Sequence, residues 1–253
     1  MPLQIPHAVR QKIRRFAHLL GYDVRRASAM NLAETRVSRL LNDHRIRTVL
    51  DVGANEGQYA TLLLDNGYRG SIISFEPLPE AWHRLKRKAA STAWPWIVAD
   101  PIALSDSNGE AEFYEAGNSL SSSLLPMSGS HVVAAPESSL LKKIRVHTAR
   151  LDDYLAALAV EPPAFLKIDV QGAETLVLNG AAQTLRDLVL GVQVEMSLRV
   201  LYEGQQLYWH TDALLRGQGF ECCYIVPEFR DPTSLHLLQY DAFYFKRPPA
   251  GGL

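Results

Sequence analysis

Hydrophobic residues along the chain alternate between short continuous runs and segments in which they recur every three or four positions. The first run covers residues 48–52, and helical spacing follows over residues 58–65. Further runs lie at residues 71–76, 96–104, 164–169 and 189–195, and further helical segments at residues 80–90, 151–158, 172–178, 181–185 and 210–218. Strands separated by helices of about 10 to 15 residues predict a mostly parallel sheet that helices cover on both faces.

The last two strand-like segments are connected differently. Residues 220–226 and 242–245 are rich in aromatic and β-branched residues, and only a loop separates them. Two late strands of this kind predict an antiparallel pair at the edge of the sheet. Earlier in the chain, Gly109 predicts a hairpin-like turn before residues 112–114, and residues 145–150 form a further candidate strand.

One long segment, residues 116–143, shows no clear periodicity and is rich in Ser, Gly and Pro. An unstructured stretch of this length is unusual inside a compact domain, and such loops are often lids or binding loops. We therefore consider it as a segment that folds over a bound acceptor.

The composition is that of an ordinary globular chain. Of 253 residues, 47% are hydrophobic and 21% are charged, which excludes a disordered protein. No apolar run approaches the roughly 18 residues of a membrane-spanning helix, and the N-terminus lacks the features of a secretory signal. Cys222 and Cys223, the two cysteines, are neighbours and unsuited to a structural disulfide. We therefore expect a protein of the cytoplasm, a reducing compartment.

The charge of the chain is unevenly distributed. Residues 1–47 contain ten Lys and Arg against three Asp and Glu, a balance of +7, so the net charge of −1 leaves −8 for the remainder. We divide the chain into this basic helical extension, a domain over residues 48–247 and a C-terminal tail over residues 248–253. A basic arm on a mildly acidic body suits an anionic partner such as nucleic acid, lipid or an acidic substrate. The alternative, which we favour from the sequence alone, is a solvated helical extension without such a partner.

The arm also carries an apolar stripe at helical spacing, formed by Ile5, Val9, Ile13, Phe16 and Leu20. We expect this stripe to dock on the domain itself or on a second subunit, as in a homodimer. Weak contact with a membrane surface is the alternative. No aromatic residues are interleaved with the charges, so nucleic acid is not an expected partner.

The strongest local motif is VLDVGANEGQYA at residues 49–60. It places Asp51 at a strand end, and Gly53 and Gly57 in the turn that opens a helix. Glycine lets a ligand approach the backbone closely, and the helix N-terminus offers unpaired N–H donors. Glu76, at the end of the next strand, can accept hydrogen bonds from both hydroxyls of a ribose. Together these residues indicate a cofactor that contains a nucleoside.

The glycine spacing distinguishes two such cofactors. A dinucleotide fingerprint needs G-x-G-x-x-G so that a pyrophosphate can sit on the helix N-terminus. This chain has Gly53 and Gly57 with the acidic Glu56 between them. S-adenosylmethionine has no phosphate, and its ammonium and sulfonium charges suit a strand end that carries Asp51. We therefore favour S-adenosylmethionine over NAD, and a methyltransferase over an NAD-linked oxidoreductase.

Further blocks of sequence resemble the FkbM-type methyltransferases and follow one another in the family's order. They span residues 48–247, and the FLKIDVQGAE block followed by VEMS is the most specific of them. The blocks are DVGANEGQYA (51–60), SFEP (74–77), ALSDSNGEAEFY (103–114), SLSSSLL (119–125), FLKIDVQGAE (165–174), VLNGA (177–181), VQVEMS (192–197), LYEGQ (201–205), GF (219–220) and LQYDAFYFKR (238–247).

The resemblance implies a Rossmann-like fold of the class I methyltransferases, with a mostly parallel seven-stranded sheet and an antiparallel edge pair. It also implies transfer of a methyl group from S-adenosylmethionine onto an oxygen, commonly a hydroxyl of a sugar or glycan. A small natural product or nucleic acid as acceptor, or a scaffold that binds the cofactor without turnover, are the alternatives. The sequence leaves open whether the acceptor is free, lipid-linked or polymer-bound.

The position of residues in the family's motifs implies cofactor contacts for this chain. The methionine part would contact Asp51, Gly53, Asn55 and Gly57. The ribose would contact Glu76, and the adenine would contact Ala103 and Leu104. Many relatives have Glu where this chain has Gln171, so no role that needs an acid is assigned there.

Methyl transfer to a sugar hydroxyl is an in-line displacement in which positioning supplies most of the acceleration, and a base that accepts the hydroxyl proton assists it. Asp169 ends its strand where open α/β sheets bind ligands, and Glu195 ends the neighbouring strand. Each carboxylate is a candidate base, a partner of the sulfonium or a metal ligand, and capping of the next helix is the alternative for Asp169. His131, whose imidazole titrates near neutral pH, is the third candidate base.

Candidate contacts to the acceptor are hydroxyl groups, an aromatic ring that can stack on a sugar, and a further carboxylate. The hydroxyl groups are those of Ser121, Ser122 and Ser123, the aromatic ring is that of Tyr202 and the carboxylate is that of Asp241. The sequence has no His and Cys cluster at metal spacing, and we predict no metal site.

Overall fold

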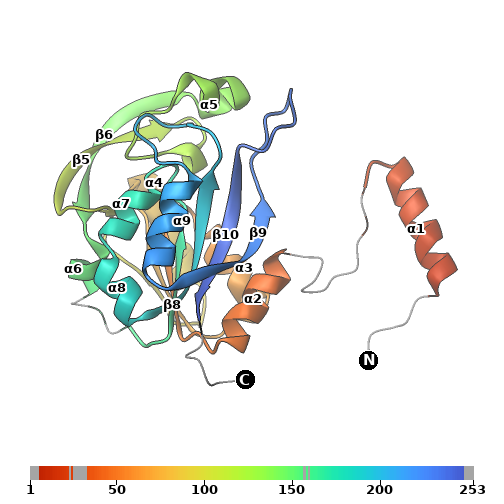
Figure 1. Ribbon diagram of the computed structural model, residues 1–253, viewed down its shortest axis with the longest axis horizontal. Helices are drawn as coiled ribbons and strands as arrows, with labels where there is room; N and C mark the ends of the chain where they lie inside the picture. The colour runs from red at the N-terminus through yellow and green to blue at the C-terminus, as the bar shows by residue number, and fades with distance from the viewer. Residues whose placement is uncertain (1–5, 23, 25–32, 156–157, 159, 248–253) are drawn as a thin grey trace.

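A seven-stranded sheet forms the centre of the structure (Figure 1). The computed structural model describes residues 6–22, 24, 33–155, 158 and 160–247. The strands of this sheet, in spatial order, are β3 (Trp96–Val98), β2 (Ser71–Phe75), β1 (Thr48–Val52), β7 (Ala164–Ile168), β8 (Val189–Ser197), β10 (Gln239–Lys246) and β9 (Phe220–Pro227).

The strands β3, β2, β1, β7 and β8 are parallel to one another. The strand β10 runs antiparallel to both β8 and β9. The predicted Rossmann-like sheet with an antiparallel edge pair is therefore confirmed. The chain proceeds from β1 to β2 on one side and later returns to β7 on the other side, so the strand order reverses beside β1. Open α/β sheets bind ligands at the carboxyl ends of the strands at such a point.

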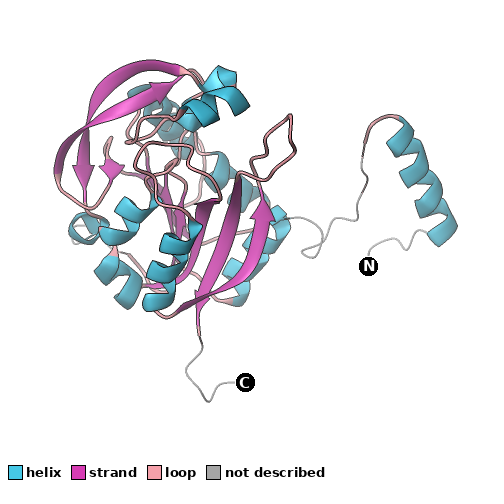
Figure 2. Cartoon of the chain, turned by 45° about the horizontal axis from the view of Figure 1, so that its top comes forward, coloured by secondary structure: helices cyan, strands magenta, loops and turns pink. Residues whose placement is uncertain are grey.

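The helices lie on both faces of the sheet (Figure 2). Side chains of α6, α7, α8 and α9 pack into a cluster on one face, and those of α2 and α3 into a cluster on the other. The helices and short 3₁₀ turns are α1 (His7–Leu19), α2 (Ala33–Asp43), α3 (Gln58–Asp65), α4 (Pro79–Ala90), η1 (Ser119–Ser121), α5 (Gly129–Ala134), η2 (Pro136–Ser138), α6 (Leu151–Leu155), α7 (Glu174–Asn179), α8 (Ala182–Asp187) and α9 (Tyr208–Gly217).

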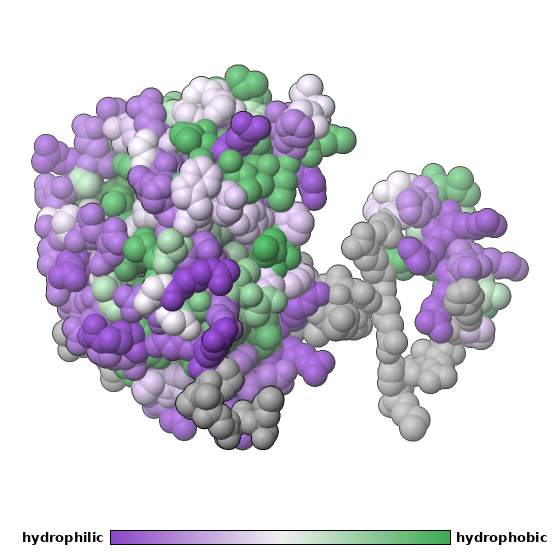
Figure 3. Space-filling view, viewed as in Figure 1, coloured by the Kyte–Doolittle hydropathy of each residue, from purple (hydrophilic) through white to green (hydrophobic). Residues whose placement is uncertain are grey.

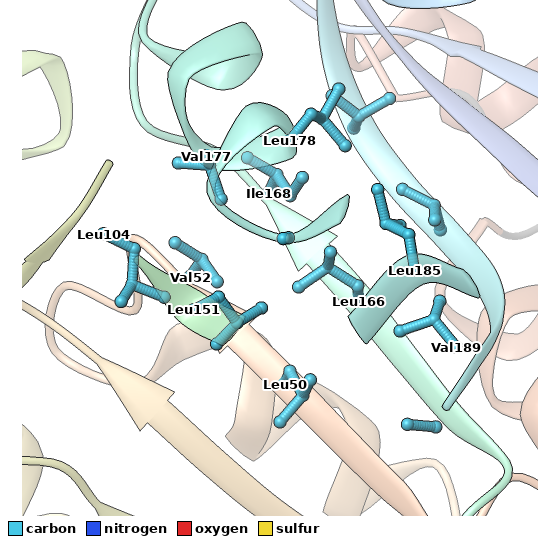
Figure 4. Close-up of a cluster of buried hydrophobic side chains, with 14 of the residues drawn as sticks. Leu50, Val52, Leu104, Leu151, Leu166, Ile168, Val177, Leu178, Leu185 and Val189 are labelled. Atoms are coloured by element: carbon cyan, nitrogen blue, oxygen red, sulfur yellow. The ribbon is translucent and has the colours of Figure 1, made fainter. Parts of the chain in front are cut away.

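The two faces of β1 pack into different clusters because successive side chains of a strand point to opposite faces. Leu50 and Val52 lie beside Leu166 and Ile168 of β7 in the cluster of Figure 4. Val49 lies in the other cluster, with side chains of α2 and α3. Every residue of β1 and β7 is buried, which explains why both strands are hydrophobic in the sequence apart from Thr48 and Asp51 of β1 and Lys167 of β7.

A second, three-stranded sheet consists of β4 (Ala103–Leu104), β6 (Leu140–Ala149) and β5 (Gly109–Ala116). The prediction of one strand over residues 96–104 is wrong, because β3 and β4 belong to different sheets. Pro101 lies between them and has no backbone N–H to donate to a neighbouring strand. The hairpin predicted at Gly109 is wrong as well, because β5 begins there and pairs with the distant β6.

The segment over residues 116–143 is more regular than the sequence predicts. It forms η1, α5 and η2, and it enters β6 at Leu140, five residues before the predicted strand. Helical elements of three to six residues complete at most about two turns, so they leave no amphipathic period in the sequence. This is why the segment reads as an irregular loop.

Within the N-terminal 47 residues, the second helix is part of the domain. Val37 and Leu41 of α2 are buried in the cluster that also contains Val49. The predicted C-terminal tail, residues 248–253, lies outside the described residues. Across the part of the chain that the structure describes, no helix is long and apolar enough to cross a membrane.

The first helix has different surroundings, and Figure 1 shows it apart from the sheet and its covering helices. Its apolar stripe is uncovered, since Val9 and Ile13 are each 44% exposed, Phe16 is 66% exposed and Leu20 is 59% exposed. Ile5, the first residue of the predicted stripe, lies outside the described residues. The docking of this stripe on the domain that we expected from the sequence is therefore not observed.

Candidate cofactor and catalytic site

A pocket lies at the carboxyl ends of β1, β2 and β7, with β4 on one side of it and the η1 turn on another. This is the point at which the strand order of the sheet reverses. The residues that were assigned to the site from the sequence and that line this pocket are Gly53, Asn55, Glu76, Ala103, Leu104, Ser122 and Asp169.

The carboxylate of Glu76 is held by two backbone groups. Its Oε2 accepts a hydrogen bond from the Asn55 N–H at 2.8 Å, and its Oε1 accepts one from the Leu78 N–H at 2.8 Å. Burial raises the pKa of Glu76 to about 7, against the opposing effect of these two N–H donors. Each carboxylate oxygen has a further lone pair, so the fixed group can still accept hydrogen bonds from ribose hydroxyls.

Gly53 is required by the close approach of β1 and β7. Its φ of 76° lies in the left-handed region, and a Cβ atom there would come within 1.8 Å of the Asp169 carbonyl oxygen. Any side chain would therefore push apart the two strand ends that line the pocket. The glycine keeps Asp169 beside the end of β1.

Gly57 has a packing role instead. It is the N-cap of α3 with φ of 79°, and a Cβ atom would lie 2.7 Å from the Trp96 ring. Gly57 does not line the pocket, although the sequence places it at the methionine part of the cofactor. Asn55 also has a positive φ. Its Nδ2 donates to Ser119 Oγ at 3.1 Å, which connects the glycine turn to η1.

Asp51 also lies outside the pocket lining, contrary to the position that we expected for it. It is fully buried inside the sheet, where Ser74 Oγ donates to its Oδ2 at 3.2 Å and Lys167 Nζ lies 3.4 Å from its Oδ1. These residues are register partners on the neighbouring strands. Burial raises the pKa of Asp51, while Lys167 and Ser74 oppose this rise. Asp51 therefore supports the site through Lys167.

One wall of the pocket is apolar. It is formed by Leu78, Ile102, Ala103, Leu104 and Phe113. An apolar wall beside a fixed carboxylate and a glycine turn has the chemistry to bind an adenosyl group, with the ring against the wall and the ribose at the carboxylate. The residues present therefore fit the cofactor that the sequence predicts.

Three side chains connect the ends of β7 and β8. Gln171 Nε2 donates to Asp169 Oδ1 at 2.9 Å and to Glu195 Oε2 at 3.0 Å. The Tyr202 hydroxyl lies 2.9 Å from Gln171 Oε1 and donates to it, which turns the amide so that its nitrogen faces both carboxylates. Gln171 and Asp169 line the pocket. The amide therefore joins a residue of the pocket to the partly buried Glu195.

Lys167 supplies the positive charge beside Asp169. Its Nζ lies 3.5 Å from Asp169 Oδ2, and it donates to the Gly53 carbonyl oxygen at 3.2 Å. Burial lowers the pKa of Lys167, but the carboxylates of Asp169 and Asp51 more than offset this, so the pKa is raised overall. The lysine is therefore charged, and it balances the two carboxylates. Lys167 and Asp169 therefore form an ion pair at the end of β7.

Glu195 and Asp241 are opposite each other in the register of β8 and β10. Burial raises the pKa of Glu195 well above its usual value, and the charges of Asp169, Glu174 and Asp241 raise it further. Burial likewise raises the pKa of Asp241 to about 7, and Gln193 Nε2 donates to its Oδ2 at 2.6 Å. Neither carboxylate lines the pocket, so both differ in position from Asp169.

His131, the third candidate base, is buried in α5. Its ring contacts Tyr202 edge to face, with a centroid distance of 5.1 Å, and also lies 5.5 Å from the Phe229 ring. Burial lowers the pKa of His131. It does not line the pocket, and its neighbours are those of a residue that packs the 116–143 segment against the domain.

The serine run and Tyr202 mainly hold this segment in place. Ser121 Oγ is hydrogen-bonded to Ser138 Oγ at 2.8 Å, and Ser123 Oγ donates to the Val170 carbonyl oxygen at 3.3 Å. Of the three serines only Ser122 lines the pocket. Tyr202 is fully buried against Gly172, whose Cβ would lie 2.9 Å from its ring. Tyr202 therefore has no exposed ring face on which a sugar can stack.

Sequence reasoning assigned no role to Ser119, Leu120 or Gln171, which all line the pocket. Gln171 is visible in the sequence as the second residue after a strand-end Asp, but its positive φ of 55° and its contact with Tyr202 are not. Ser119 and Leu120 reach the pocket through the fold of the 116–143 segment, which has no periodic signal. Only the expectation that this segment covers a ligand pointed to them.

Comparison with known proteins identifies the domain. A family model described as "Methyltransferase FkbM domain" matches residues 51–222. This range contains the glycine turn and the FLKIDVQGAE and VEMS blocks on which the resemblance rests. The match confirms the predicted family, and with it a methyltransferase whose methyl donor is S-adenosylmethionine.

Individual relatives are more distant. The chain is 27% identical over 206 residues to the 2-O-methyltransferase NoeI of Sinorhizobium fredii, covering 78% of this chain and 81% of NoeI. It is 27% identical over 138 residues to the hexuronic acid methyltransferase AglP of Haloferax volcanii, covering 54% of this chain and 51% of AglP. Among solved structures, Aeropyrum pernix fibrillarin with bound S-adenosylmethionine aligns with a TM-score of 0.48 at 14% identity, covering 85% of this chain and 75% of fibrillarin.

Proposed function

The chain belongs to the FkbM methyltransferase family, and we propose that it transfers a methyl group onto a hydroxyl oxygen of a sugar or glycan. The observation that carries this proposal is Asp169, a partly exposed carboxylate in the lining of the pocket that also contains Glu76. The names of NoeI, a 2-O-methyltransferase, and AglP, a hexuronic acid methyltransferase, support an acceptor of this class.

The residues that hold the cofactor follow from the pocket. Glu76 accepts the ribose hydroxyls, Ala103 and Leu104 contact the adenine, and the turn at Gly53 and Asn55 contacts the methionine part. When bound, S-adenosylmethionine supplies a methyl group on a positively charged sulfur. The role of this chain is to hold the acceptor hydroxyl in line with that methyl group, which is where most of the acceleration arises.

Asp169 is the base in this proposal. Its side chain is 40% exposed, so it can reach an acceptor hydroxyl and afterwards release the proton to water. The hydroxyl proton moves to the Asp169 carboxylate, and S-adenosylmethionine, when bound, would supply the methyl group to the hydroxyl oxygen, with its sulfur as the leaving group. Glu195 acts through Gln171 and not on the acceptor, and His131 keeps the structural surroundings described above.

Gln171 is a positioning residue for Asp169, and Gln171→Met tests this role. The variant keeps the side-chain length but cannot bridge Asp169 and Glu195. We expect kcat to fall about tenfold, within the value of a hydrogen bond to a charged group, while the Kd for S-adenosylmethionine changes less than about twofold. Steady-state kinetics with titration calorimetry measure both quantities. Equal losses in kcat and cofactor affinity would indicate general damage to the pocket instead.

The acceptor class is tested by release of S-adenosylhomocysteine. Purified protein with S-adenosylmethionine is given sugars, small natural products or RNA and DNA oligomers in parallel, and we expect product release above background with hydroxylated sugars. Release with nucleic acid alone, or with small natural products alone, contradicts the sugar assignment. Cofactor binding without release for every acceptor favours a scaffold that has lost turnover.

A further inference from the structure

The α1 helix is amphipathic and its apolar face is uncovered. Val9, Ile13 and Phe16 follow one another at helical spacing and are between 44% and 66% exposed. Leu19 and Leu20, at the end of the helix, are 84% and 59% exposed. Five apolar side chains with this exposure on one short helix need a partner.

The charged residues of this helix are all basic. They are Arg10, Lys12, Arg14 and Arg15, and no Asp or Glu occurs before Asp23. At 3.6 residues per turn, Arg14 and Arg15 lie away from the apolar face, and Arg10 and Lys12 lie at its two edges. Figure 3 shows the side of α1 that faces the viewer as mainly hydrophilic. The helix thus carries a cationic face and an apolar face with basic residues along the border.

We propose that α1 lies on the surface of an anionic lipid membrane. A helix of this type buries its apolar face at the boundary between headgroups and acyl chains, while its basic residues pair with lipid phosphates. Lys and Arg at the border of the face suit this arrangement, because their long stems lie along apolar groups while their charges reach the headgroups. The helix is too short to span a bilayer, so it binds in the plane of the surface.

Charge complementarity favours lipid as the partner of the apolar face of α1 over the domain of this chain and over a second copy of the chain. The domain of this chain does not cover the stripe, although it carries the opposite net charge. A second copy offers the same domain surface that the helix leaves unused here. An anionic bilayer matches both faces of the helix at once, and this inference does not depend on which acceptor the domain methylates.

The test is binding of the full-length chain to vesicles of phosphatidylcholine with or without phosphatidylglycerol, measured by flotation. Each basic residue near an anionic surface contributes about 1 kcal/mol, so binding should be at least about tenfold tighter with phosphatidylglycerol and should weaken with salt. Arg14→Glu with Arg15→Glu should weaken it at least about tenfold, and Ile13→Ser with Phe16→Ser should do the same.

A matched control changes the same charges elsewhere. Lys86 and Arg87 are exposed on α4, and Lys86→Glu with Arg87→Glu should leave vesicle binding within about twofold of the unmodified chain. Equal binding of the α1 variants and the unmodified chain overturns the proposal. Light scattering measures the oligomeric state as a second test. If the unmodified chain is a dimer that does not bind vesicles, and the α1 variants lose this dimer, then a second copy of the chain covers the apolar face and the proposal is overturned.

Discussion

Asp169→Asn is expected to lower kcat for methyl transfer by between about a hundredfold and ten-thousandfold, the usual contribution of a positioned base. The amide keeps the size of the carboxylate and lines the same pocket, but it cannot accept the hydroxyl proton. The Kd for S-adenosylmethionine should change little, because the ribose and adenine contacts that we assign lie at Glu76 and β4. Single-turnover kinetics with saturating cofactor isolate this effect.

The control for this prediction is His131→Ala. His131 packs against Tyr202 and Phe229 and does not line the pocket. We therefore expect the variant to have a lower thermal stability. At a temperature where it is folded, its kcat should be within about tenfold of that of the unmodified enzyme. A loss in His131→Ala that exceeds the loss in Asp169→Asn would reverse the assignment of the base.

Glu76→Ala is expected to weaken S-adenosylmethionine binding by about 1.5–3 kcal/mol, the range for hydrogen bonds to a charged group, which is roughly tenfold to 150-fold in Kd. The variant removes the acceptor of the ribose hydroxyls and also leaves the N–H groups of Asn55 and Leu78 without their partner. Titration calorimetry measures the change, and 5′-methylthioadenosine, which has the ribose but no amino acid part, should show the same loss. Unchanged affinity for both compounds would refute the ribose assignment.

The pH dependence of the same group gives an independent measurement. Burial raises the pKa of Glu76 to about 7, so cofactor affinity should rise as the pH increases through 7 and the carboxylate becomes ionised. The stability of the cofactor-free protein should change in the opposite direction. A carboxyl group whose pKa is higher in the folded than in the unfolded protein stabilises the fold at pH values below the unfolded pKa. This stabilisation is lost as the pH rises through the folded pKa of about 7. Glu76→Gln should remove the pH dependence of cofactor affinity and reduce that of stability, and the dependence of stability that remains belongs to other buried carboxyls such as Asp241 and Glu174, whose pKa values burial also raises to about 7.

The centre of the main sheet was predictable because strands such as β1 and β7 are buried on both faces. A strand such as β1 then contains no polar alternation and stands out as a hydrophobic run between helical segments. The separation of β3 from β4 was not predictable from hydrophobicity, since residues 96–104 are apolar throughout except near Pro101. Short helical elements in residues 116–143 escaped prediction because one or two turns have no period.

The candidate site was predictable where function depends on strand ends. Glu76 and Asp169 each follow the last residue of a buried strand, and the sequence places both at the ligand-binding edge of the sheet. Asp51 differs because it lies inside its strand, where it is fully buried and contacts Ser74 and Lys167 of the neighbouring strands. Contacts such as Tyr202 with Gln171 join residues 31 positions apart, and no local pattern marks them.

Transfer of an isotope-labelled methyl group tests the central claim most directly. The enzyme is incubated with S-adenosylmethionine labelled at the methyl carbon and with the sugar that releases most S-adenosylhomocysteine, and the product is examined by NMR. We expect a labelled methyl group on a hydroxyl oxygen of the sugar, formed at least about a hundredfold more slowly when Asp169→Asn replaces the enzyme. A label found on nitrogen or carbon, or a sugar that remains unlabelled while the cofactor is bound, would contradict it.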